Sequence, residues 1–287
     1  MKIKVENLQF SYRIKKVLNV SNIEFEQGKI YGIVGKNGVG KTTFFKTLTN
    51  IIPNYSGLVE IDGVDIKKDF KILSKVGIVL DDMELYKNHT GLFNLRYFGG
   101  LRGGFDETYA LKLARELEID DSINKKVGSY SLGMSKKLIL LISIMNDAQI
   151  LIFDEPFRGL DAKSVDWFKN YLLDLKNQGR IILISSHVQK DIETLSDKVL
   201  VLSNGDFSDI FDLKNAVQNY IYQVEVNDKT LFTNLLHKNK IQFEEQEKFI
   251  KFELDNANFK DVFKQSVAQE IEFYQIEKVN KFIELIK

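Results

Sequence analysis

The chain has 287 residues, and its 40 lysines and arginines balance its 40 aspartates and glutamates, so no basic excess indicates a nucleic-acid partner. It has no cysteine, which excludes disulfides and cysteine-ligated metals. Its longest unbroken apolar runs, such as Leu138 to Ile142, are far shorter than the roughly 18 residues that a membrane helix needs. The N-terminal residues also lack the apolar core of a signal peptide. We therefore expect a soluble, cytoplasmic chain whose contact with any membrane goes through a partner.

Strands and helices alternate through most of the chain. An apolar strand from Lys29 to Gly35 enters a glycine-rich loop, and a helix follows from Lys41 to Thr49. Helical patterning from about 82 to 146 predicts a helical subdomain inserted at that point. Later apolar runs bounded by polar residues are Gln149 to Asp154, Arg180 to Ser185 and Lys198 to Ser203. Such runs, alternating with helical stretches such as Ala162 to Lys176, are typical of a parallel sheet buried on both faces in an α/β domain.

Glycine and proline mark a boundary near residue 212. All 18 glycines and both prolines lie at or before Gly205, so the tail lacks the residues that build tight turns and phosphate loops. In the tail, apolar residues recur with helical spacing around 231–236 and 259–267 and alternate as in a strand around 250–254. We predict an α/β domain over 1–212 and a small α+β domain over 213–287.

The segment from Gly35 to Thr42, GKNGVGKT, is a phosphate-binding loop. Glycines in such a loop let consecutive backbone N–H groups close around phosphate oxygens, and the helix that follows presents its positive N-terminus to them. Lys41 is expected to reach the β- and γ-phosphates of ATP, and the Thr42 hydroxyl to ligate Mg²⁺. The residues expected to contact ATP in this segment are Gly35, Asn37, Gly38, Gly40, Lys41, Thr42 and Thr43.

An apolar strand that ends in two carboxylates, Ile150 to Glu155, supplies the second half of an ATPase site. Asp154 is expected to hold Mg²⁺ indirectly or through water, and Glu155 to orient and deprotonate the attacking water. Many strands end in acidic residues, so this motif gains its meaning from the phosphate loop before it. Together the two motifs predict an enzyme that binds and hydrolyses ATP with Mg²⁺ as the metal.

Further short segments resemble those of ABC transporter nucleotide-binding domains. Tyr130 to Leu138, YSLGMSKKL, resembles the ABC signature, Gly159 to Asp161 resembles the D-loop, and Ser185 to His187 resembles the segment of the switch histidine. Tyr12 stands before the phosphate loop, where the family has an aromatic residue. Because these elements occur in the family's order over residues 1 to about 210, the chain is identified as a member of that family.

The resemblance implies a role for each of these residues. Tyr12 would stack on adenine, a role that suits a π face because any nucleobase binds it by contact area. Ser131 and Gly133 would contact the γ-phosphate of the ATP held by the opposite subunit of a head-to-tail dimer. His187 would contact the γ-phosphate and hold the geometry for hydrolysis, and Asp161 would couple the two sites.

Two positions depart from the family's usual pattern. The signature reads Ser131-Leu132-Gly133-Met134 in place of SGGQ, a form similar to that of ATPases serving drug, bacteriocin and small-peptide exporters. Asp81 stands where the family has its Q-loop glutamine, a Mg²⁺ ligand and a link to the membrane subunit. A carboxylate oxygen can still ligate Mg²⁺, but a register shift of one residue would give that position to Asp82.

A stretch rich in aromatic residues, Leu85 to Tyr97, follows Asp82. In the family the corresponding surface receives the membrane subunit. Its residues Leu92, Phe93 and Leu95 are equally compatible with a helix that packs in the core.

The resemblance implies a motor subunit that dimerises around two ATP molecules, with an identical or a different ATPase subunit, and drives a separate transmembrane permease from the inner face of the cell membrane. Export of peptides or drugs is favoured by the signature, and because small tails of this kind resemble those of exporter ATPases. A single phosphate loop and the lack of sustained heptads argue against a soluble ABC protein of translation or DNA repair. The alternative is a nucleotide-binding regulatory or soluble ABC protein with little or no transport role, to which Asp81 gives some weight.

Overall fold

The structure is a computed structural model that describes residues 1–213 and 219–286. The chain divides into two compact units, Met1–Phe211 and Asp212–Lys287. Each unit has a hydrophobic core of its own. Within the described ranges, no helix combines the length and the apolar character needed to cross a membrane.

The first unit is built on a six-stranded sheet with the order β10-β9-β3-β8-β7-β6. Its strands are β3 (Lys29–Val34), β6 (Val76–Val79), β7 (Ile150–Asp154), β8 (Ile181–Ser185), β9 (Lys198–Ser203) and β10 (Asp206–Asp212). The pairs β3–β8, β3–β9, β6–β7 and β7–β8 are parallel. Every residue of β7 and β8 is buried, which explains why these strands are apolar without alternation. The predicted α/β fold with a parallel sheet is confirmed.

A second, antiparallel sheet has no counterpart among the predicted elements. Its order is β2-β1-β4-β5. The strands are β1 (Lys2–Tyr12), β2 (Lys15–Glu26), β4 (Ser56–Ile61) and β5 (Val64–Asp65). Buried and exposed residues alternate along much of β1 and β2, because one face of the sheet packs on the core and the other meets solvent.

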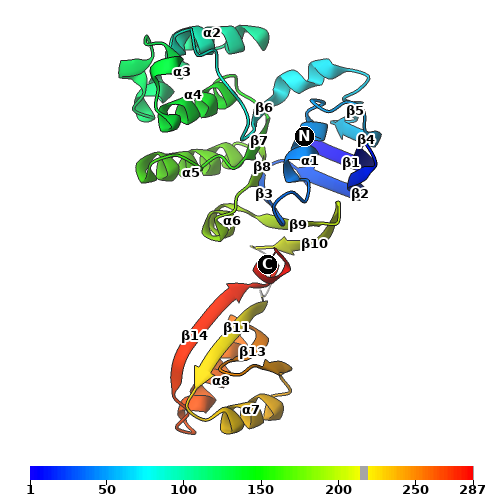
Figure 1. Ribbon diagram of the computed structural model, residues 1–287, viewed down its shortest axis with the longest axis vertical. Coiled ribbons are helices and arrows are strands. Elements are labelled where there is room, and N and C mark those ends of the chain that lie inside the picture. Colours follow the sequence, from blue (N-terminus) through cyan, green and yellow to red (C-terminus); the bar gives the residue numbers. More distant parts are fainter. Residues whose placement is uncertain (214–218, 287) are drawn as a thin grey trace. The chain divides into compact units, whose positions relative to one another are not determined.

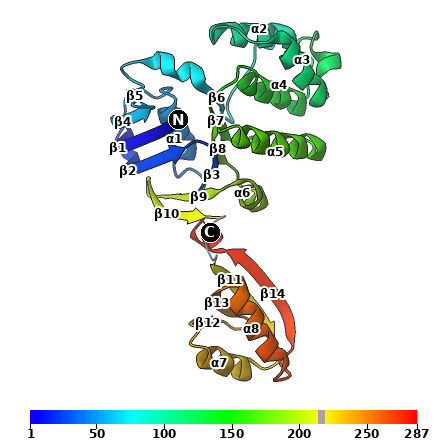
Figure 2. The ribbon, with the colours of Figure 1, turned by 180° about the vertical axis from the view of Figure 1, so that it is seen from behind.

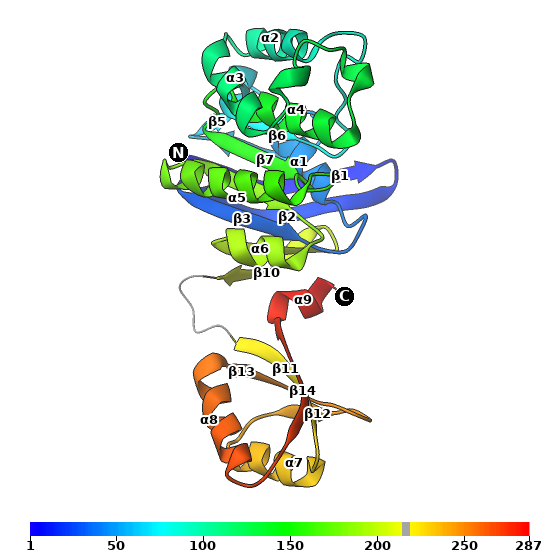
Figure 3. The same cartoon turned by 90° about the vertical axis from the view of Figure 1, so that its left-hand side faces the viewer.

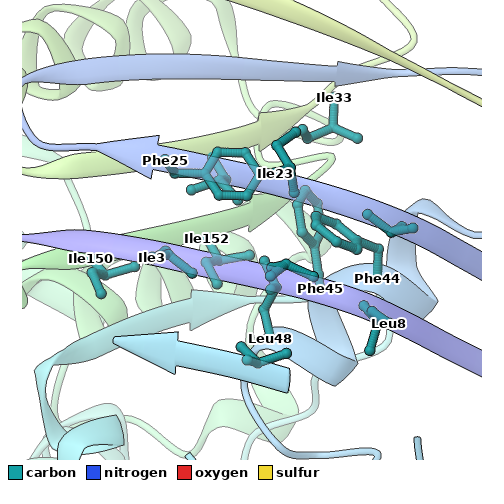
Figure 4. Close-up of a cluster of buried hydrophobic side chains, with 14 of the residues drawn as sticks. Ile3, Leu8, Ile23, Phe25, Ile33, Phe44, Phe45, Leu48, Ile150 and Ile152 are labelled. Carbon is teal, nitrogen blue, oxygen red and sulfur yellow. The ribbon is translucent and has the colours of Figure 1, made fainter. Parts of the chain in front are cut away.

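Helix α1 (Lys41–Leu48) packs into the core that the two sheets share. Figure 4 shows Phe44, Phe45 and Leu48 of this helix in one cluster with side chains from β1, β2, β3 and β7. The ring centroids of Phe44 and of Phe25 on β2 are 6.2 Å apart, and Phe44 and Phe45 are fully buried. Because close-packed interiors resist displacement, the start of α1 is held firmly where the glycine loop ends.

Helices α5 (Ala162–Asn177) and α6 (Gln189–Leu195) pack on the six-stranded sheet from the other side, as Figure 3 shows for α5. Side chains alternate along β7, so that Ile150 and Ile152 join the cluster around α1. Phe153 instead meets Phe168 of α5 edge-on, with ring centroids 5.3 Å apart. The sheet is therefore covered on both faces.

Three helices form a group at one side of the first unit, away from β1 and β2 (Figures 1 and 2). They are α2 (Gly91–Leu101), α3 (Glu107–Glu116) and α4 (Leu132–Ile144). Short 3₁₀ turns are found at Phe70–Lys75, Asp120–Ser122 and Val127–Ser129. On α2, Leu95 is fully buried whereas Phe93 is 39% exposed, so the aromatic-rich stretch serves both core and surface. Helix α4 presses so closely on β6 that a Cβ on Gly77 would collide with the carbonyl oxygen of Ser143.

The second unit contains both strands and helices. In chain order they are β11 (Asn219–Val226), α7 (Lys229–Lys238), β12 (Phe243–Glu245), β13 (Ile250–Asp255), α8 (Asn256–Val267), β14 (Phe273–Asn280) and α9 (Lys281–Ile286). The antiparallel sheet has the order β12-β13-β11-β14. The elements from β11 to β14 therefore have the βαββαβ order of ferredoxin-like domains. The helices predicted near 231–236 and 259–267 and the strand near 250–254 are α7, α8 and β13.

Aromatic rings hold α7 and α8 against this sheet. Tyr222 and Phe259 stack with ring centroids 3.8 Å apart. The ring of Phe252 lies 5.7 Å from that of Tyr222 and 5.8 Å from that of Phe232. Every residue of this cluster belongs to the second unit, which gives that unit a core with which to fold on its own.

Phe252→Ala is expected to destabilise the second unit alone, by about 3–5 kcal/mol, because Phe252 is only 3% exposed and its ring fills the core. Urea unfolding can be followed by Trp167 fluorescence, which reports on the first unit, and by far-ultraviolet circular dichroism, which reports on both units. We expect an early transition in the dichroism that is absent from the fluorescence. The matched control is Tyr274→Ala, at a side chain that is 66% exposed. An equal shift of both signals would show that the two units unfold together.

Candidate nucleotide-binding and catalytic site

A cavity of about 590 Å³ lies beside the glycine loop that joins β3 to α1. It is lined by Asn37, Gly38, Gly40, Lys41, Thr42, Thr43, Asp81, Asp154, Glu155, Arg158 and His187. Gly35 starts this loop, and a Cβ there would lie 2.5 Å from the carbonyl oxygen of Leu202, so the close approach of these two segments requires glycine. The volume is that of a small-molecule site, and the loop with the start of α1 suits it to an anion.

The Lys41 ammonium lies at this cavity and donates to backbone oxygens of the loop itself. Its Nζ is 2.8 Å from the carbonyl oxygen of Gly35 and 3.4 Å from that of Lys36. Burial lowers the pKa of Lys41, while the carboxylates of Glu155 and Asp154 act in the opposite direction. A phosphate group would offer the ammonium a charged partner in place of neutral carbonyls, so Lys41 fits the role expected of it.

Asp154, at the end of β7, is 3% exposed and is held by two hydroxyl groups. The Ser185 hydroxyl, at the end of β8, donates to Oδ1 at 2.5 Å, and the Thr42 hydroxyl donates to Oδ2. In the described ranges, no group of three or more His, Cys, Asp or Glu side chains is arranged to hold a metal ion by itself. Mg²⁺ takes oxygen ligands and keeps several from phosphate and water, so Thr42 and Asp154 fit the metal-binding roles expected of them.

Glu155 adopts a backbone φ of +50°, a left-handed conformation that is uncommon outside glycine. Its N–H donates to both the carbonyl oxygen and the Oγ of Ser185, each at 3.2 Å. Its Oε2 lies 2.7 Å from Nδ1 of His187 and accepts a second hydrogen bond, at 3.2 Å, from the His187 backbone N–H. Strained conformations of this kind cluster at active sites, and here the turn brings Glu155 to the cavity wall with His187 as its orienting partner.

Asp81 lines the same cavity and contacts two cations. Its Oδ2 accepts a hydrogen bond from Nη1 of Arg158 at 2.9 Å, and its Oδ1 lies 3.8 Å from Nζ of Lys136. The carboxylate of Asp82 instead pairs with Lys46 of α1 at 2.7 Å, and Asp82 is not among the lining residues. Of the two aspartates that the sequence leaves open for the metal-binding position, Asp81 is the one at the cavity.

The signature segment lies at the start of α4. The Ser131 hydroxyl caps this helix by accepting a hydrogen bond from the Met134 N–H at 3.2 Å. The backbone at Gly133 passes close to the carbonyl oxygen of Gly159 in the segment that resembles the D-loop. Neither Ser131 nor Gly133 lines the cavity of its own subunit.

Asp161 ties this second segment to α4. Its carboxylate pairs with Lys137 at 2.8 Å and caps α5 by accepting from the Ser164 N–H at 2.9 Å. These hydrogen bonds, the one from Lys137 first, hold the pKa of Asp161 well below its usual range. Asp161 is not among the residues that line the cavity.

Tyr12 lies at the surface at the end of β1 and is 52% exposed. Its ring meets Phe10 edge-on, with centroids 4.7 Å apart. It is not among the residues that line the cavity, so the structure does not bring it together there with Lys41 and Thr42.

Several residues at the site carry roles for which the motifs gave no indication. Ser185 holds both Asp154 and Glu155, whereas Lys136 and Arg158 share Asp81. For Lys136 a signal exists, because it lies in helix α4 shortly before residues 138–144, which are all buried, and a lysine there needs an acidic partner. The sequence carries no such signal for Arg158, because its partner Asp81 lies 77 residues earlier in the chain.

Known ABC transporter proteins match this chain over most of its first unit. The ABC transporter family pattern matches residues 18–158. An ABC transporter ATP-binding protein of Methanocaldococcus jannaschii is 35% identical over 207 residues, which cover 71% of this chain and 75% of that protein. The bacitracin transport ATP-binding protein BcrA of Enterococcus faecalis is 35% identical over 205 residues, covering 71% of this chain and 67% of BcrA.

Solved structures agree on the fold. One described as the ATP binding subunit of an ABC transporter superposes with a TM-score of 0.69 at 23% identity, over 75% of this chain and 91% of the other. The chain thus belongs to the ABC transporter ATP-binding proteins, and it is an ABC transporter ATPase with an additional C-terminal unit.

Asp81→Asn is expected to make ATP affinity depend less on Mg²⁺. An ionised carboxylate at the cavity repels the triphosphate when no cation is present and favours it when a divalent cation lies between them. We expect EDTA to weaken ATP binding about fivefold to tenfold more in the wild type than in the variant. Binding of a fluorescent ATP analogue with Mg²⁺ and with EDTA measures this. Asp82→Asn is the control, and a larger effect there would assign the role to Asp82.

Proposed function

We propose that this chain hydrolyses ATP in the cavity beside its glycine loop and so drives the export of a peptide or drug by a separate membrane subunit. The observation that carries the proposal is the Glu155 carboxylate. It lies at the wall of a cavity that Lys41 also lines, and His187 holds it through two hydrogen bonds. This is the arrangement that water attack on a bound γ-phosphate needs.

The side chains at the cavity suit the separate tasks of hydrolysis. The loop N–H groups and Lys41 would bind the triphosphate, because both match the charge and geometry of phosphate oxygens. Thr42 and Asp154 would hold Mg²⁺, whose charge offsets that of the phosphates. Glu155 would accept the proton of the attacking water, and His187 would keep that carboxylate oriented.

We further propose a head-to-tail dimer, with an identical or a different ATPase subunit, that closes on two ATP molecules. Ser131, Gly133 and Asp161 do not line the cavity of their own subunit, so they are available to the nucleotide of the other. Leu132 supports this arrangement, because its side chain is 78% exposed beside Gly159 and a dimer would bury it. Closure on ATP and opening after hydrolysis would then move the partner subunit.

The membrane subunit would dock on an exposed aromatic cluster formed by Tyr86, His89, Phe93 and Tyr97. His89 and Phe93 stack with ring centroids 4.0 Å apart, and Tyr86 meets Tyr97 edge-on at 5.0 Å. Tyr86, Phe93 and Tyr97 are 46%, 39% and 40% exposed. Aromatic residues are enriched in protein interfaces, and this surface would hold the chain at the inner face of the cell membrane.

Export rests on the signature Ser131 to Met134 and on the relative BcrA, whose name states that it serves bacitracin transport. An amphipathic peptide is the substrate class that we propose. The second candidate function is that of a nucleotide-binding regulatory or soluble ABC protein with little or no transport role. It is favoured by Asp81, whose contacts with Arg158 and Lys136 put a network of charges at the position of a neutral glutamine. Steady-state phosphate release measured with and without the membrane subunit separates the two functions, because a transport motor responds to that subunit and a regulatory protein without a transport role does not.

Glu155→Gln is expected to abolish phosphate release, by at least about a hundredfold, while ATP binding persists, because an amide cannot accept the proton from water. With hydrolysis blocked, the ATP-bound dimer should accumulate. Size-exclusion chromatography with ATP and Mg²⁺ would show it, together with an assay of phosphate release. The control is Glu277→Gln, at an exposed residue of β14. Unchanged phosphate release from the Glu155 variant would refute the assignment.

Phe93→Ala is expected to weaken attachment to the membrane subunit about tenfold without changing ATP affinity, because truncating a central aromatic residue removes much of the energy of an interface. The measurement is co-purification in detergent with a tagged permease that the wild-type chain binds. Phe70→Ala is the control, since Phe70 is 69% exposed and lies outside the cluster. Equal recovery with both variants would place the docking surface elsewhere.

A further inference from the structure

The ion pair between Asp81 and Arg158 lies where two cavities meet. Both residues line the cavity beside the glycine loop, and both also line a second cavity of about 580 Å³. The remaining walls of this second cavity include Met83 to Leu85 and the start of α4. The pair therefore forms part of the boundary between the nucleotide cavity and its neighbour.

The two cations that share Asp81 differ in their freedom to move. The Arg158 side chain is 65% exposed, whereas that of Lys136 is 9% exposed. Burial lowers the pKa of Lys136, and the Asp81 carboxylate is the main influence that raises it again. The buried Lys136 ammonium thus needs the Asp81 carboxylate as a counter-charge, whereas the exposed Arg158 guanidinium does not. If the Arg158 side chain moves away, Lys136 still pairs with the Asp81 carboxylate, so neither Asp81 nor Lys136 is left without a charged partner.

The position of Arg158 in the cavity wall shows where its side chain would move. The backbone N–H of Arg158 donates to the carbonyl oxygen of Glu155 at 3.3 Å, so Arg158 belongs to the turn that brings Glu155 to the cavity. The cavity wall carries three carboxylates, those of Asp81, Asp154 and Glu155. A guanidinium matches phosphate in charge and in the planar geometry of its donors better than it matches a single carboxylate oxygen. A γ-phosphate beside Glu155 is therefore the stronger partner.

We propose that Arg158 senses the γ-phosphate: it is held by Asp81 when the cavity contains ADP or no nucleotide, and it exchanges Asp81 for the γ-phosphate when ATP binds. The inference rests on the proposed binding of ATP in this cavity. ADP ends at the β-phosphate, which the glycine loop and Lys41 surround, so ADP leaves the ion pair intact. Arg158 accordingly contributes to the preference for ATP over ADP and not to nucleotide binding in general.

The first test compares ATP with ADP. Fluorescent analogues of both are titrated into the full chain with Mg²⁺, using the wild type and Arg158→Gln. We expect the variant to bind ATP about tenfold more weakly and ADP within about twofold of the wild type, because only ATP loses a charge-assisted hydrogen bond. Arg96→Gln is the matched control: Arg96 is 59% exposed, pairs with Glu107 through its guanidinium and lines neither cavity. An equal loss for both nucleotides, or no loss, would overturn the proposal.

The second test asks whether Asp81 and Arg158 act through each other. In EDTA, Asp81→Asn should strengthen ATP binding about fivefold, partly because it releases Arg158. In the Asp81→Asn, Arg158→Gln double variant most of that gain should vanish, since no guanidinium remains to be released. A gain of the same size in both backgrounds would mean that Asp81 acts by charge repulsion alone, and the exchange would be refuted. If Arg158→Gln proves unstable in thermal melting, Arg158→Lys takes its place and should keep an intermediate ATP preference.

Failure of the proposed function would give a different set of affinities. If the wild type and Lys41→Ala bind ATP equally weakly, the cavity is not the nucleotide site. If Lys41→Ala abolishes binding while Arg158→Gln leaves the ratio of ATP to ADP affinity unchanged, the site stands and the sensing role of Arg158 falls.

Discussion

The packing of α1 between the two sheets of the first unit is the constraint on which the site depends. A phosphate-binding loop works because its N–H groups are already in place when the anion arrives. The loop itself is rich in glycine and would be loose alone. Phe44 and Phe45, fully buried a few residues after Lys41, tie its far end to residues of both sheets. Loss of either ring would lower the free energy of unfolding by about 3–5 kcal/mol and leave the loop less firmly positioned.

Strand order accounts for the rest of the arrangement. β3, β8 and β7 are neighbours and run in parallel, so the segments that follow them lie together. Asp154 and Ser185 are the last residues of β7 and β8, and Thr42 lies in α1, after the glycine loop that follows β3. Two hydrogen bonds join these three residues across 112 and 31 positions of sequence. The same Ser185 also holds the backbone of Glu155. The chemistry is thus carried by residues that lie at the ends of buried parallel strands or, like Thr42, in the helix that follows one.

Much of this could be predicted from the sequence because the signals are local. Uninterrupted apolar runs mark strands buried on both faces, and GKNGVGKT is contiguous. The antiparallel sheet could not be predicted because its alternation is broken by consecutive exposed residues, such as Ser11 to Lys16 around the turn between β1 and β2. The contacts of Asp81 could not be predicted because Lys136 and Arg158 are distant from it in sequence. A motif specifies the position of a residue but not the charged side chains that the fold brings next to it. The surface position of Tyr12 likewise depends on the turn between β1 and β2.

The contact between α4 and β6 has a mechanical consequence. Because the helix sits against Gly77 with no room for even a methyl group, the two elements can slide past each other only by breaking the packing. β6 ends two residues before Asp81, and α4 begins at the signature segment. Asp81 lies 3.8 Å from Lys136, so the end of β6 at the nucleotide cavity and the start of α4 at the signature segment lie side by side, at the same end of this packed pair. Because the packing leaves no free space at Gly77, a displacement of the signature segment would carry Asp81 and its wall of the cavity with it.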